Sequence, residues 1–85
     1  MSDPAKETIA LDHPVEADGA QVTSLSMRRA KARDSRDAQR GGGSPADVEI
    51  RLFANLCEVA TDVVEELDMA DYGKLQDAYN RFLAG

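Results

Sequence analysis

The chain has 85 residues, a length that allows one small domain and excludes a two-domain enzyme. Hydrophobic residues make up 42% of it and only four residues are aromatic, none of them Trp, so we expect a modest, mostly aliphatic core. Sixteen acidic against ten basic residues give a net charge of −6, which disfavours nucleic acid and anionic lipid as partners of the whole surface.

The chain has a single cysteine, Cys57, and a single histidine, His13. One cysteine cannot form a disulfide within the chain, and one histidine beside it makes no ligand set for zinc, so we expect no metal and no cofactor. No apolar run follows the N-terminal residues, so we expect neither a signal peptide nor a membrane segment, and a reducing cytoplasm as the compartment.

The charges are unevenly distributed along the chain. Residues 28–40 carry six basic and two acidic side chains, whereas the segments on either side are acidic. We call five of these residues the basic strip: Arg28, Arg29, Lys31, Arg33 and Arg36. The strip either grips phosphate or an acidic partner, or lies against the protein's own acidic helices, and we favour the second interpretation. No aromatic residue is interleaved among these basic residues, so the stacking platform expected of a protein that binds single-stranded nucleic acid is missing.

The first part of the chain predicts an antiparallel hairpin over residues 7–28. Ile9 and Leu11 alternate with polar residues, and His13-Pro14 is expected to end this first strand near residue 11. The second strand is expected near 20–28, with Leu25 and Met27 on one face together with Thr23. A loop from Asp12 to Gly19 would join the two strands. Two strands alone are marginally stable, so their apolar face must pack on a helix.

A surface helix is predicted over residues 30–40, where good helix formers predominate. The glycines at 41–43 then form a flexible linker. A phosphate-binding loop is not supported, because neither a preceding strand nor a following Lys-Ser/Thr pair is present.

Two amphipathic helices are predicted in the second half, over residues 45–60 and 69–84. Ser44-Pro45-Ala46-Asp47 is a capping signature for the first, and Asp68 to Asp71 is a second capping signature. A short turn near Thr61 would join the helices into a helical hairpin. We therefore expect a disordered N-terminus at residues 1–6 and a single small α+β domain over 7–85.

No set of residues indicates catalysis. His13 precedes a proline in a loop, and the carboxylates at 65–71 are explained by helix starts, where negative charge is favourable. Cys57 lies in an apolar helical stripe, which is typical of a buried thiol of low reactivity. We expect no enzymatic activity.

The order of three segments resembles a known family. They are residues 8–15 (TIALDHPV), 22–29 (VTSLSMRR) followed by 31–34 (KARD), and 65–76 (EELDMADYGKLQ). This order is similar to that of the small tail assembly chaperones of contractile-tailed phages and prophages, and the likeness covers about residues 6–84. The family has no catalytic motif that could be carried over to single positions.

The resemblance implies a non-structural protein of virion morphogenesis in the host bacterial cytoplasm. It would bind the tape measure protein, and the tail tube protein is a second candidate partner. A wide-faced helical hairpin could cover the apolar stripes of such a helical partner. The residues expected to do so are Leu52, Phe53, Leu56, Tyr72, Tyr79 and Phe82. For most of these residues we favour a place in the domain's own core over partner contact, and a core shared in a homo-oligomer is a further alternative. A small nucleic-acid-binding or regulatory protein that uses residues 28–40 is the alternative function.

Overall fold

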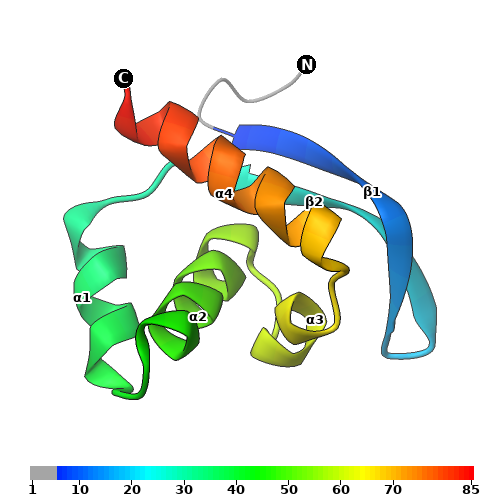
Figure 1. Ribbon diagram of the computed structural model, residues 1–85, viewed down its shortest axis with the longest axis horizontal. Coiled ribbons are helices and arrows are strands. Elements are labelled where there is room, and N and C mark those ends of the chain that lie inside the picture. The colour runs from blue at the N-terminus through cyan, green and yellow to red at the C-terminus, as the bar shows by residue number, and fades with distance from the viewer. Residues whose placement is uncertain (1–5) are drawn as a thin grey trace.

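The computed structural model describes residues 6–85. A two-stranded antiparallel sheet is followed by four helices (Figure 1). The strands are β1 (Lys6–Ala17) and β2 (Ala20–Arg28), and the helices are α1 (Ala32–Arg40), α2 (Pro45–Cys57), α3 (Thr61–Glu65) and α4 (Met69–Leu83). The predicted α+β class, with an N-terminal hairpin and a helical second part, is confirmed. Residues 1–5, most of the segment expected to be disordered, lie outside the described residues.

The hairpin is longer than the sequence predicted, and its turn is shorter. β1 continues to Ala17, and only Asp18 and Gly19, with φ of 52° and 78°, separate it from β2. The expected loop from Asp12 to Gly19 is therefore wrong. Between the pairs Ala10–Ser24 and Val15–Val22, four residues of β1 stand opposite the single Thr23. This bulge accommodates Pro14, which has no N–H to offer a ladder, and Thr23 opposite it is exposed rather than buried.

The core lies between the hairpin and the helices. Ile9, Leu11, Leu25 and Met27 point into it, which confirms that this face of the hairpin packs on helices. In Figure 1, α4 runs across the molecule beside β1, while α1, α2 and α3 lie in a row below it. The largest fully buried apolar side chains are Phe53, Met27, Leu56, Leu75 and Val64. The core thus draws on both strands and on all four helices, with Ala38 as the contribution of α1.

The helix ends follow from local chemistry. At α2, Ser44 Oγ accepts a hydrogen bond from the Asp47 N–H, and the Asp47 carboxylate accepts one from the Ser44 N–H. This is the capping box predicted from the sequence. α2 ends at Cys57 instead of residue 60, because Glu58 adopts a left-handed conformation with φ of 57°. The expected turn near Thr61 is a short helix, α3.

The segment between α1 and α2 contains Gly41, Gly42 and Gly43. Gly42 and Gly43 have φ of 68° and 94°, a region that favours glycine. Arg51 of α2 donates to the Ala38 carbonyl and, at 3.1 Å, to the Gly42 carbonyl. α1 begins at Ala32, two residues later than predicted, since Lys31 is extended and its N–H donates to the Asp34 carboxylate at 2.8 Å.

Candidate partner-binding surface

The six residues expected to bind a partner divide into two groups. Leu52, Phe53 and Leu56 of α2 are buried in the core of the single chain, the last two completely. Tyr72, Tyr79 and Phe82 of α4 are only partly buried and pack at the edge of that core. Of these six residues, then, only the three on α4 leave apolar surface exposed. Contact of any of the six with a partner stays a prediction.

An aromatic cluster joins α2 to α4. The Phe53 ring lies between two tyrosine rings, with its centroid 5.6 Å from that of Tyr72 and 5.7 Å from that of Tyr79. Tilted rings at this separation attract each other beyond the apolar area that they bury. These ring contacts hold α4 in one orientation against α2 and so determine which face of α4 stays exposed.

Glu49 of α2 binds two residues of α4. The Tyr72 hydroxyl donates to Glu49 Oε1 at 2.5 Å, and Gln76 Nε2 donates to the same oxygen at 2.9 Å. Burial of the phenol, and then the hydrogen bond to Glu49, raise the pKa of Tyr72 above its ordinary value. Tyr72 therefore stays a neutral donor, and its ring is held in one orientation.

An open groove of about 340 Å³ lies next to this network. Its walls come from α2, α3, the segment after α3 and the first half of α4; the lining residues are Ala46, Glu49, Ile50, Val64, Glu65, Leu67, Met69, Tyr72 and Gln76. Val64 and Leu67 are buried, Ile50 and Tyr72 are partly exposed, and Met69 is 76% exposed. The groove is mainly apolar, and the charged side chains that line it are acidic.

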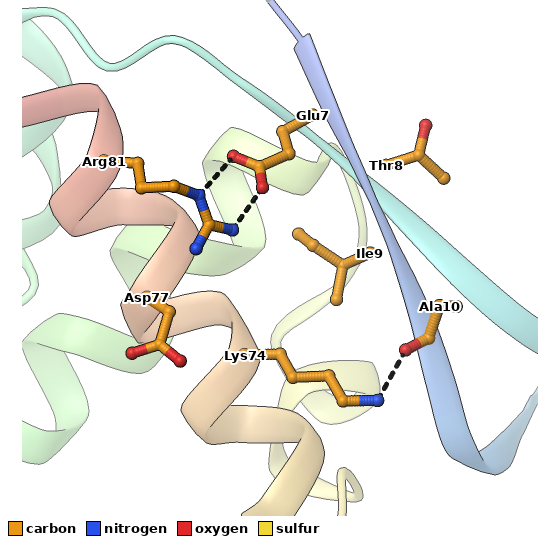
Figure 2. A pocket seen from close by; sticks show the side chains of 7 residues that line it. All are labelled: Glu7, Thr8, Ile9, Ala10, Lys74, Asp77 and Arg81. Carbon is orange, nitrogen blue, oxygen red and sulfur yellow. Dashed lines mark hydrogen bonds and ion pairs between the residues drawn. The ribbon is translucent and has the colours of Figure 1, made fainter.

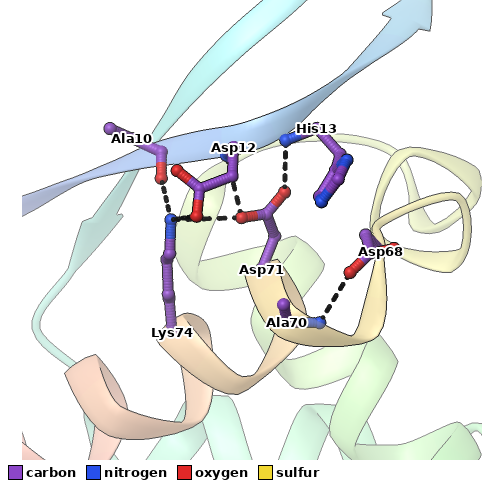
Figure 3. A network of polar contacts seen from close by, with 7 residues as sticks. All are labelled: Ala10, Asp12, His13, Asp68, Ala70, Asp71 and Lys74. Atoms are coloured by element: carbon purple, nitrogen blue, oxygen red, sulfur yellow. Dashed lines mark hydrogen bonds and ion pairs between the residues drawn. The ribbon is translucent and has the colours of Figure 1, made fainter.

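The start of α4 is tied to β1 by a buried carboxylate, shown in Figure 3. Asp71 is completely buried, and its two oxygens accept hydrogen bonds from the backbone N–H groups of Asp12 and His13, each at 2.9 Å. These are bulge residues whose N–H groups lack a cross-strand partner. The bond from Asp12 and then the other donors lower the pKa of Asp71 against the effect of burial. The assignment of Asp71 to a capping signature is therefore wrong, and only Asp68 caps α4, by accepting from the Ala70 N–H.

Two cations of α4 also bind β1. Lys74 Nζ donates to the Ala10 carbonyl at 2.9 Å and lies 3.0 Å from Asp12 Oδ2 and 3.2 Å from Asp71 Oδ1. Further along α4, Arg81 forms an ion pair with Glu7. Figure 2 shows the Arg81–Glu7 pair and the bond from Lys74 to the Ala10 carbonyl, which lie at a pocket of about 310 Å³ between α4 and β1. Because both cations already have anionic partners, this pocket is a contact between elements rather than an anion site.

Comparison of the sequence with models of known protein families gives a match. A family model described as "Phage tail assembly chaperone proteins, E, or 41 or 14" matches residues 8–84. The chain belongs to this family. The match spans the hairpin, the bulge, the basic strip and all four helices, and it confirms the resemblance noted in the sequence. No curated protein and no solved structure matches.

Two members of the basic strip are engaged within this tail assembly chaperone. Arg28 forms a two-pronged ion pair with the buried Asp34, with Nη1 and Nη2 at 3.0 and 2.8 Å from the carboxylate oxygens. The guanidinium of Arg29 lies 5.7 Å from the centre of the Phe82 ring. Lys31, Arg33 and Arg36 are exposed. The strip is therefore partly bound to the protein's own side chains, and it does not present five free cations.

Within residues 6–85 of the chaperone, the side chains that could bind a metal are dispersed and the thiol is buried. No group of three or more His, Cys, Asp or Glu side chains there could hold a metal ion. Cys57 is buried, and burial raises the pKa of its thiol to about 11, which suppresses the reactive thiolate. In the same residues no helix has both the length and the apolar character needed to cross a membrane. The family is one of chaperones and not a known class of enzymes.

Two features of the chaperone's surface were missed by sequence reasoning. Met69 was interpreted only as part of a helix start, yet it is the most exposed large apolar side chain among the described residues. Ile50 lies in the amphipathic helix predicted over residues 45–60, where nothing in the sequence singles it out, yet it lines the groove. Periodicity could have assigned both to helices, but it could not show that α3 ends beside them.

Proposed function

We propose that this chaperone binds the tape measure protein and keeps it soluble until the tail tube polymerises around it. The proposal rests on family membership together with one observation, the apolar groove that the chain leaves uncovered beside Met69. The place of action would be the cytoplasm of the bacterial host, where tails are assembled. The tail tube protein is a second candidate partner.

The physical argument concerns exposed apolar surface. A long helical protein with apolar stripes associates with itself unless the stripes are covered. A groove with an apolar floor and a polar rim covers such a stripe by helix-in-groove packing. The described fold has this kind of groove, and its core is complete without a partner, so binding does not require the chaperone to unfold.

Co-expression tests the proposal. A fragment of the tape measure protein that is insoluble alone should appear in the soluble fraction when the chaperone is produced with it, and the two should copurify. An unrelated helical protein that aggregates should stay insoluble under the same conditions. A tape measure fragment that remains insoluble in every such pairing would contradict the proposal.

The alternative function is nucleic-acid binding by residues 28–40. The exposed Lys31, Arg33 and Arg36 favour it, while the engagement of Arg28 with Asp34 and the net charge of −6 oppose it. If it were correct, duplex or single-stranded DNA would be retarded at low salt, with a steep loss of affinity as salt is added. If neither kind of DNA is retarded at low salt, nucleic-acid binding by residues 28–40 is excluded.

A further inference from the structure

We propose that the groove lined by Ile50, Met69 and Tyr72 is the docking site of the chaperone, and that its occupant is a partner α-helix with an apolar stripe flanked by Lys or Arg. This inference rests on the proposed function, because the tape measure protein is the partner expected to supply that helix. It names the surface and the chemistry of recognition, which family membership alone does not.

The shape of the groove suits one face of a helix. Among the lining residues, Val64 and Leu67 are buried, while Ile50 of α2 and Tyr72 of α4 are partly exposed. Met69, at 76% exposed, lies on the rim. A methionine is unbranched and polarisable, so it adapts to the apolar side chains of a partner without a fixed fit.

One wall of the groove is already ordered. Glu49 accepts hydrogen bonds from both Tyr72 and Gln76, and the Tyr72 ring packs on Phe53. Side chains that are fixed before binding lose little conformational entropy when a partner arrives. Burial of the aromatic wall would therefore contribute to affinity with little opposing cost.

Charge selects the partner. Glu49 and Glu65 line the groove, and Asp62, Glu66 and Asp68 are exposed on the adjoining α3 and the start of α4. No Lys or Arg occurs anywhere between Arg51 and Lys74 in the sequence. An apolar groove whose charged lining residues are both carboxylates attracts a helix that carries cations and repels one that carries anions.

The other cavities carry no comparable argument. In the pocket lined by Glu7, Lys74 and Arg81, both cations already have anionic partners. The shallow site at Arg33 and Arg36 on α1 is lined by three residues only. A further pocket of about 330 Å³, beside the hairpin turn and α3, is also lined by apolar and acidic residues, but by no aromatic and no exposed large apolar side chain. The groove differs from these pockets because it combines an exposed methionine, a hydrogen-bonded aromatic wall and acidic charge.

A matched pair of substitutions on α4 tests the location. Met69→Asp introduces a charge in the groove, and Leu83→Asp does the same at the other end of α4, where Leu83 is 64% exposed. Both residues are on the surface, so both variants should fold, which circular dichroism and thermal unfolding would verify. The probe is a helical peptide from the tape measure fragment, labelled for fluorescence anisotropy. At high salt, where attraction between an added carboxylate and the cations of the peptide is screened, we expect Met69→Asp to weaken binding roughly tenfold or more through loss of the apolar contact, and Leu83→Asp to leave it within about twofold.

A second matched pair tests the charge. Glu65 lines the groove, whereas its exposed neighbour Glu66 does not. Glu65→Lys should weaken binding about three- to tenfold at low salt and less at high salt, while Glu66→Lys should have the smaller effect at both. A version of the peptide with Gln at every Lys and Arg should bind wild-type protein less tightly and lose the difference between the two variants.

The outcomes separate this inference from the proposed function. If wild-type protein solubilises the tape measure fragment and Met69→Asp does so equally well, the function stands and the groove is not the docking site. If Leu83→Asp abolishes binding and Met69→Asp does not, the surface lies at the Phe82 end of α4. If wild-type protein neither binds the peptide nor solubilises the fragment, the proposed function fails and this inference fails with it.

Discussion

At the scale of single residues, two buried carboxylates have structural roles that local sequence signals do not reveal. The Asp71 carboxylate accepts hydrogen bonds from two backbone N–H groups of the β1 bulge. The Asp34 carboxylate accepts hydrogen bonds from the Arg28 guanidinium and the Lys31 N–H. Each carboxylate joins an early strand or its exit to a later helix. Both lie in the segments that carry the family resemblance, so part of that resemblance reflects folding rather than partner contact.

The role of Asp71 is tested by Asp71→Asn. The amide keeps the shape of the carboxylate but replaces one acceptor oxygen with a donor, so one of the two bulge N–H groups faces another donor. Lys74 also loses an ionic partner. We expect the midpoint temperature of thermal unfolding to fall by several degrees. The control is Asp77→Asn on the exposed face of the same helix, which should leave the midpoint unchanged; equal midpoints for both variants would refute the anchor.

The Arg28–Asp34 pair predicts a dependence of stability on pH. The hydrogen bonds from Arg28, against the effect of burial, lower the pKa of Asp34 from 3.8 to about 2. Because the folded state holds this proton less tightly than the unfolded state, the pair stabilises the fold above about pH 4 and ceases to do so as the pH falls through about 2. Allowing for solvent around Arg28, the contribution is about 1–2 kcal/mol.

Urea unfolding of wild-type protein and Asp34→Asn measures this contribution. The difference in unfolding free energy between them should be largest near neutral pH and should shrink steadily below about pH 4. A difference that is constant with pH would show that the pair does not stabilise through the ionised carboxylate.

At the scale of elements, the hairpin differs most from the sequence-based prediction. Pro14 usually ends a strand, but here the strand bulges at Pro14 and resumes at Val15, which pairs with Val22. Resumption is stable because a helix 59 positions away supplies the missing hydrogen-bond acceptor. A long-range contact therefore overrides the local preference of proline.

Two glycines, one in the hairpin turn and one inside α4, give a matched test of the backbone conformation of these elements. Gly19 has φ of 78° in the two-residue turn, so Gly19→Ala should lower the free energy of unfolding by about 1 kcal/mol. Gly73 lies inside α4, and an added Cβ there would meet no atom within 4 Å, so Gly73→Ala should raise it by about 0.5–1 kcal/mol. Chemical denaturation measures both. Opposite signs are required, and a destabilising Gly73→Ala would show that α4 needs the glycine.

At the scale of the whole molecule, the division between core and surface decides how substitutions affect binding. Phe53 and Leu56 are completely buried, whereas Met69 and Leu83 are exposed. The first pair holds the hairpin against the helices, and the second pair contributes little to stability. A loss of binding therefore has different meanings at the two kinds of position.

Phe53→Ala tests this division. Removal of the ring from the core should cost about 3–5 kcal/mol, a large part of the 5–15 kcal/mol typical of a folded domain. The variant should be partly unfolded at 37 °C and should lose the tape measure fragment for that reason, as protease sensitivity would report. A Phe53→Ala variant that keeps its stability and still loses the fragment would instead place Phe53 in the interface.

Sequence alone determined the hairpin, the number and order of the main helices, the capping of α2 and the family, because these depend on local periodicity, turn residues and motif order. It could not determine the length of β1, the partner of Asp71 or which apolar residues stay exposed. Those depend on where α4 and α3 come to lie against β1 and α2, and such contacts between distant segments leave no periodic trace in the chain. Only the tertiary structure could show that Phe53 is covered and that Met69, sixteen residues later in the sequence, is not.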